Sequence, residues 1–154
     1  MKTMSIGPWT IKVNLEKNKE WYDENPAISC TCNYCANYKL ACDTFPSSVK
    51  KFFNTLGIDP QKEGEVSHYV ENEDGTHLYS VFYHFYGAII KGPKEEGTYY
   101  ELPHSSFGKN ESVGIGLHTD LQLVPSSMTE PVIQLEISEI TIPWLVKKEE
   151  DVNS

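Results

Sequence analysis

Hydrophobic and polar residues alternate along several short stretches of the chain, which is the period of a half-buried β-strand. Near the N-terminus, Trp9 to Leu15 place Trp, Ile, Val and Leu on one side and Thr, Lys and Asn on the other. Residues 131–146 alternate in the same way, and the hydrophobic phase changes near Glu139. This pattern predicts an early strand and a late strand with a bulge at the phase change.

A helical period replaces the alternation between these ends. The residues from about Asn33 to Cys42 favour a short helix, and Pro46 follows its end. Ser47 or Ser48 can cap a second helix, whose apolar residues recur at helical spacing up to Leu56. Residues 21–26 are instead expected to form a turn-rich connection. The sequence therefore predicts a short helical pair near residues 33–56.

The middle of the chain predicts a hairpin. Asp74-Gly75 is typical of a two-residue turn, and it separates extended segments over residues 65–73 and 76–90. Pairing Glu73 with Thr76 would place Val66 opposite Tyr83. Further strands are expected over 98–102 and 112–124.

These elements together predict an α+β fold, with an antiparallel sheet or β-sandwich partly covered by the helical pair. An all-β barrel with a helical insertion is the alternative. We expect residues 1–154 to form a single domain, with a frayed tail over 147–154.

Charge and composition narrow the functional classes. The formal net charge is −9, from 22 acidic and 13 basic residues, so a nucleic-acid partner is not expected. The first residues do not resemble a signal peptide, and no apolar stretch approaches 18 residues, so we expect a cytoplasmic protein without a membrane partner. No familiar catalytic motif is present, which favours a protein that is not an enzyme.

A cluster of cysteines allows three interpretations. Cys30, Cys32 and Cys35 form a C-x-C-x-x-C pattern that could bind zinc, with His84 or His118 completing the site. Cys42 lies seven residues beyond Cys35, about 10 Å along a helix, too far to share that metal. Cys32 and Cys35 could also exchange disulfides from a helix start, or the thiols could simply be buried as small apolar groups.

The second extended segment is rich in aromatic residues on both faces. Phe82, His84 and Tyr86 share one face, and we expect this face to bind a protein partner or a small ligand. His84 and the pair His118 and Asp120 are the histidine positions worth testing. The leading hypothesis is a small intracellular binding module, and a thiol protein with a zinc or redox role is the alternative.

Several segments together resemble a known family. They are the stretch from Cys30 to Tyr38, Phe45-Pro46, residues 56–60, Pro131-Val-Ile-Gln-Leu-Glu136 and Pro143-Trp144. The chain resembles a family of small proteins found mainly in Gram-positive bacteria, and the similarity spans most of its length. This family has no assigned activity, so the resemblance implies no mechanism.

Overall fold

A computed structural model describes residues 1–25, 32–45, 47–93, 100–102, 113–119, 128 and 131–146. Its helices and strands follow one another as β1 (Lys2–Ile6), β2 (Trp9–Val13), α1 (Leu15–Glu24), α2 (Asn33–Cys42), α3 (Ser47–Leu56), β3 (Glu65–Glu71), β4 (His77–Lys91), β5 (Tyr100–Leu102), β6 (Val113–His118) and β7 (Val132–Ile142). None of the helices in the described part of the chain is long and apolar enough to cross a membrane.

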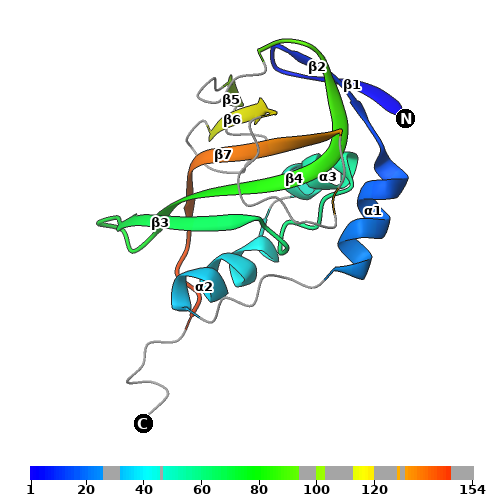
Figure 1. Ribbon diagram of the computed structural model, residues 1–154. Helices are drawn as coiled ribbons and strands as arrows, with labels where there is room; N and C mark the ends of the chain where they lie inside the picture. Colours follow the sequence, from blue (N-terminus) through cyan, green and yellow to red (C-terminus); the bar gives the residue numbers. More distant parts are fainter. Residues whose placement is uncertain are drawn as a thin grey trace.

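All the strands join one antiparallel sheet, as the α+β prediction requires (Figure 1). The strand order is β1-β2-β4-β7-β6-β5, and β3 pairs with β4 outside this path. Strand β4 has 15 residues, so its first half pairs with β3 and its second half with β2, while β7 runs along its other side. β4 is therefore the strand around which the sheet is organised.

The core lies between the sheet and the helical pair. Strands β4 and β7 bury one face of alternating apolar residues, in which Tyr83 pairs with Leu135 and Phe85 with Ile133. The Phe53 ring of α3 meets the Tyr83 ring edge to face at 5.1 Å. From α2, the Tyr38 hydroxyl lies 2.5 Å from that of Tyr83. α2 and α3 thus both pack on this face of the sheet.

The predicted helical pair is confirmed. α2 and α3 occupy the expected residues, and Gly57 follows α3 with φ +76°, a left-handed conformation that ends a helix at little cost for glycine. A Cβ at this position would lie 2.9 Å from the Cβ of Asn18. Gly57 therefore both ends α3 and lets α1 approach.

The expectation of a turn-rich connection over residues 21–26 is wrong for the described part, because α1 extends to Glu24. Asn14 caps this helix by accepting a hydrogen bond from the Lys17 N–H at 3.2 Å. Its only buried residues are Asn18 and Tyr22, one turn apart. Both bond to the backbone of other elements, so tertiary contacts rather than an apolar stripe hold α1 in place.

The hairpin is confirmed but its predicted turn and register are wrong. Glu71 pairs with His77, and Gly75 adopts φ +85° in a loop of residues 73–75 rather than in a two-residue turn. Val66 lies opposite Val81, two residues from the predicted Tyr83. A shift of two keeps each residue on the same face of the strand, so Val81 and Tyr83 still share a face as predicted.

A bulge near Glu139 is confirmed. Ile137 pairs with Val81 and Ile140 with Tyr79, so β7 carries one more residue than β4 in this interval. The extra residue restores inward orientation for Ile140 and Ile142, both buried.

Candidate functional site

A row of polar side chains crosses the face of the sheet opposite α2 and α3. His84 of β4 lies directly opposite Gln134 of β7, which lies directly opposite His118 of β6. Glu136 lies two residues further along β7, on the same face. We call His84, Gln134, Glu136 and His118 the polar row, and it lies in the interior of the sheet rather than at its edge.

Hydrogen bonds connect the polar row from one strand to the next. His84 Nε2 lies 3.2 Å from Gln134 Oε1, and the Gln134 amide nitrogen donates to Glu136 Oε1 at 3.1 Å. His118 Nε2 lies 3.0 Å from the same Glu136 oxygen. One carboxylate oxygen therefore serves as acceptor for two neighbouring side chains.

Three members of the polar row are almost completely buried, and the Glu136 side chain is 16% exposed. Gln134 is 0% exposed, His118 1% and His84 2%. His118 Nδ1 is buried without a hydrogen-bond partner. An unpaired buried polar atom usually costs stability, so it calls for a physical explanation.

The predicted binding residues Phe82, His84 and Tyr86 share this face, but they differ in exposure. Phe82 is partly exposed, while His84 and Tyr86 are buried. Tyr86 packs with Met128 and Val132, and the Lys17 ammonium lies 4.1 Å from the centre of its ring. A partner's surface would therefore reach Phe82 more readily than the other two side chains.

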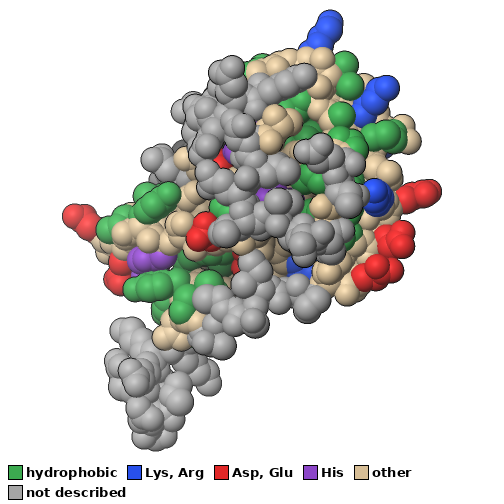
Figure 2. Space-filling model, viewed as in Figure 1, with side chains coloured by type: hydrophobic (Ala, Val, Ile, Leu, Met, Phe, Trp, Pro, Cys, Tyr) green, Lys and Arg blue, Asp and Glu red, His purple; other side chains and the backbone are tan. Residues whose placement is uncertain are grey.

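A second cluster lies where β3, β4, the start of α2 and the segment after β7 meet. His68 Nε2 and His77 Nδ1 are 2.7 Å apart. The Tyr34 ring stacks on His68 with a centroid distance of 4.1 Å, and the Trp144 ring lies 4.4 Å from that of His77. Figure 2 shows histidine surface among hydrophobic and acidic side chains over β3. We call His68, His77, Tyr34 and Trp144 the imidazole patch.

Cys32 and Cys35 lie at the same end of α2 as Tyr34 of the imidazole patch, and not in the polar row. Cys32 caps α2 and its Sγ accepts a hydrogen bond from the Cys35 N–H at 3.4 Å. Tyr34, which stacks on His68, lies between these two cysteines in the sequence. The histidines near the cysteines are thus His68 and His77, whereas the predicted fourth ligands His84 and His118 belong to the polar row.

The predicted metal ligand Cys30 lies outside the described residues. Within the described part of the chain, no group of three or more His, Cys, Asp or Glu side chains is arranged to hold a metal ion. Cys32 is exposed, Cys35 is intermediate and Cys42 is buried.

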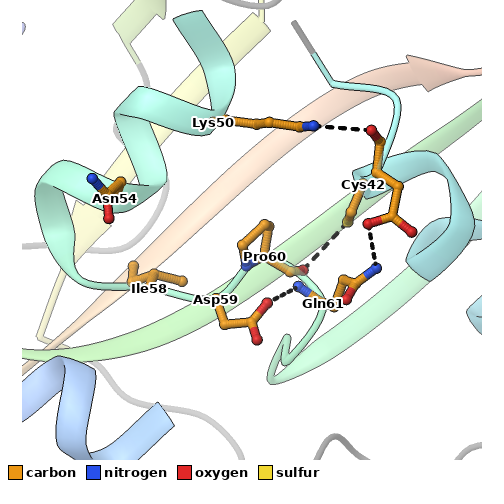
Figure 3. A pocket seen from close by; sticks show the side chains of 8 residues that line it. Cys42, Lys50, Asn54, Ile58, Asp59, Pro60 and Gln61 are labelled. Atoms are coloured by element: carbon orange, nitrogen blue, oxygen red, sulfur yellow. Dashed lines mark hydrogen bonds between the residues drawn. The ribbon is translucent and has the colours of Figure 1, made fainter. Parts of the chain in front are cut away.

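A pocket of about 290 Å³ opens between the end of α2, α3 and the loop that follows α3 (Figure 3). Cys42 contributes to its wall, but the thiol donates to the Pro60 carbonyl at 3.5 Å. Burial raises the pKa of Cys42 well above its ordinary value, and the nearby Glu63 carboxylate acts in the same direction. Cys42 is therefore a poor nucleophile at neutral pH, and the pocket lacks an activated thiol.

The sequence interpretation singled out His84 and His118 but not Gln134 and Glu136 as site residues. In the alternation of β7 these two occupy the polar phase, which normally faces solvent. Gln134 and Glu136 are functional candidates only because His84 and His118 lie beside them. These residues become neighbours when β7 pairs with β4 on one side and with β6 on the other. Asp120, predicted to act with His118, lies outside the described residues.

Comparisons of the chain with known protein families, curated proteins and solved structures give no match. The fold and the two clusters therefore rest on the geometry described above, and the resemblance to a Gram-positive family stays a prediction.

Proposed function

We propose that this chain is a small binding domain whose ligand site is the sheet face with Phe82, His84 and Tyr86, centred on the polar row. The observation that carries the proposal is the convergence of four polar side chains from three central strands, three of them buried and Glu136 partly exposed. Apolar residues of similar volume would stabilise such a position at least as well. Retaining polar groups there is more readily understood as a requirement for binding than for folding.

The cross-strand residue pairs next to the polar row support a binding site that is partly polar and partly apolar. Tyr86 pairs with Val132 on one side of the row, and Phe82 pairs with Glu136 on the other. Gly116 of β6 lies opposite Glu136 and has no side chain to cover it. A few polar groups within apolar walls are typical of small-molecule sites.

The proposal can be tested by making the row apolar. In a triple variant, His118→Leu, Gln134→Leu and Glu136→Leu, we expect a free energy of unfolding equal to or higher than that of the natural chain, measured with urea. The same variant should lose the thermal shifts that a library of polar metabolites gives with the natural chain. A loss of more than about 2 kcal/mol in the variant would show that the row is structural, and the proposal would be wrong.

A second function is favoured by the position of the cysteines. We propose as the alternative that Cys32 and Cys35, together with Cys30, hold zinc or exchange disulfides. The stacking of Tyr34 on His68 supports it, because it brings an imidazole to the same helix turn as the two thiols. In the described part of the chain Cys32, Cys35 and His68 do not form a metal-binding arrangement, so a zinc site would need these side chains to move together when the metal binds.

Elemental analysis of protein purified without chelators or an affinity tag tests the alternative. A zinc site predicts about one zinc per chain in the natural protein and a large loss of zinc in Cys32→Ser and in His68→Ala. His118→Ala is the matched control and should keep its metal. Rapid selective labelling of Cys32 or Cys35 in metal-free protein would favour disulfide exchange, and slow labelling without metal would contradict both roles.

A further inference from the structure

Glu136 determines which group donates and which accepts in each hydrogen bond of the polar row. An ionised carboxylate only accepts hydrogen bonds, so the Gln134 side chain must present its NH₂ group to Glu136. The Gln134 carbonyl oxygen then faces His84, and His84 Nε2 must carry a hydrogen to donate to it. The opposite orientation of the amide would place two oxygens against each other.

The same carboxylate selects the tautomer of the neutral His118 ring. His118 Nε2 donates to Glu136 Oε1 at 3.0 Å, so in the neutral ring Nδ1 carries the lone pair. This nitrogen is buried and has no partner.

From this geometry, and resting on the proposed function, we infer that the ligand of the polar row is a hydrogen-bond donor, with an ammonium, amidinium or hydroxyl group that binds His118 Nδ1. The Glu136 carboxylate and the net charge of −9 both disfavour an anion in its place. Glu136 is then a positioning residue, because it holds the tautomer of His118 through Nε2.

The tautomer can be measured directly. Long-range ¹H–¹⁵N correlation spectra at pH 7.5 should show His118 with protonated Nε2 and bare Nδ1. In Glu136→Leu this preference should be lost, while His68 and His77, far from the row in the fold, should keep their signals. A His118 ring that is protonated on Nδ1 in the natural chain would overturn the inference.

The class of ligand can be tested with acetamidinium and acetate, which have the same size and planar shape but opposite hydrogen-bonding character. At constant ionic strength, acetamidinium should shift the His118 Nδ1 resonance with a Kd roughly in the millimolar range, as expected for so small a ligand. Acetate should leave it unchanged, and His118→Phe should abolish the acetamidinium effect on the neighbouring His84 signal.

The outcomes separate this inference from the proposed function. Binding of acetate at His118 would overturn the donor inference and leave the row a ligand site. A response to neither probe would also contradict the donor inference, while the proposed function would be judged by the stability of the triple variant.

Discussion

Asn18 is a buried polar residue whose role differs from that of the polar row, because it bonds to the backbone. Its amide nitrogen donates to the carbonyls of Leu56 at 2.9 Å and Tyr86 at 3.2 Å, and its oxygen accepts from the Tyr86 N–H at 2.5 Å. One side chain thereby ties α1 to α3 and β4. Backbone groups cannot be mutated away, so removing Asn18 would leave them unpaired.

We therefore expect Asn18→Leu to lower the free energy of unfolding by about 2–4 kcal/mol, since each buried group left unpaired costs roughly 1–3 kcal/mol. Urea unfolding followed by circular dichroism measures the change. Asn14→Ala is a milder control on the same helix, because losing an N-cap costs only about 1 kcal/mol. Equal effects of the two variants would contradict the role given to Asn18.

The described cysteines differ in their access to reagents. Cys32 is exposed, whereas burial and the Glu63 carboxylate raise the pKa of the buried Cys42 thiol. With a maleimide at pH 7.5, Cys32 should be labelled at least tenfold faster than Cys42, and unfolding in urea should remove the difference. Peptide mapping by mass spectrometry identifies each site. Comparable rates in the folded protein would contradict the burial of Cys42.

At the scale of elements, two glycines of β4 and its hairpin serve different purposes. Gly75 has φ +85° and a Cβ there would meet nothing within 4 Å, so Gly75→Ala adds only backbone strain. A Cβ at Gly87 would lie 2.6 Å from the Lys12 carbonyl oxygen and would separate β2 from β4. We expect Gly75→Ala to cost about 1 kcal/mol and Gly87→Ala clearly more, both measured by urea unfolding. A larger loss for Gly75→Ala would show that the hairpin loop is under other constraints.

The sequence correctly predicted the elements in which the spacing of apolar residues alone shows which side is buried. The helical pair, the inward residues of β2 and the bulge of β7 all follow from local spacing. α1 was missed because its buried residues, Asn18 and Tyr22, are polar or amphipathic and acquire partners only from distant elements. The predicted hairpin register was wrong because Asp74-Gly75 is compatible with both a two-residue and a three-residue loop. The turn residues alone do not determine which of the two loops forms.

The candidate site was harder to predict than the fold for a related reason. His84 and His118 were recognised as unusual, but Gln134 and Glu136 have the pattern of ordinary solvent-facing residues of a strand. Only strand order reveals that β7 lies between β4 and β6, so that its polar side chains meet two histidines. A single sequence does not encode that order in any local signal.

At the scale of the whole molecule, the imidazole patch joins three distant parts of the chain. His68 stacks on Tyr34 of α2, and His77 contacts Trp144 after β7. Because the two ring nitrogens share a hydrogen bond, at least one of the rings must be neutral at that position. Burial lowers the pKa of His68, the His77 charge lowers it further, and the Glu71 carboxylate opposes both.

A lowered pKa means that the fold favours neutral His68. Its contribution to stability is complete above the unfolded pKa of about 6.5 and is lost as the pH falls through that value and the folded pKa. Between pH 7.5 and 5, the natural chain should lose more stability in urea than His68→Asn. Glu71→Gln should steepen the loss, since it removes the carboxylate that raises the pKa of His68. A steeper loss in His68→Asn would contradict this assignment.

The position of β4 also determines when the chain can fold during its synthesis. β4 must pair with β2, made long before it, and with β7, which ends at Ile142. Helices and the hairpin can form before β7 is made, but the second side of the central strand stays open until β7 has left the ribosome. A nascent chain therefore exposes one side of this aromatic-rich strand from the emergence of β4 until the emergence of β7, and in that interval a chaperone would recognise it.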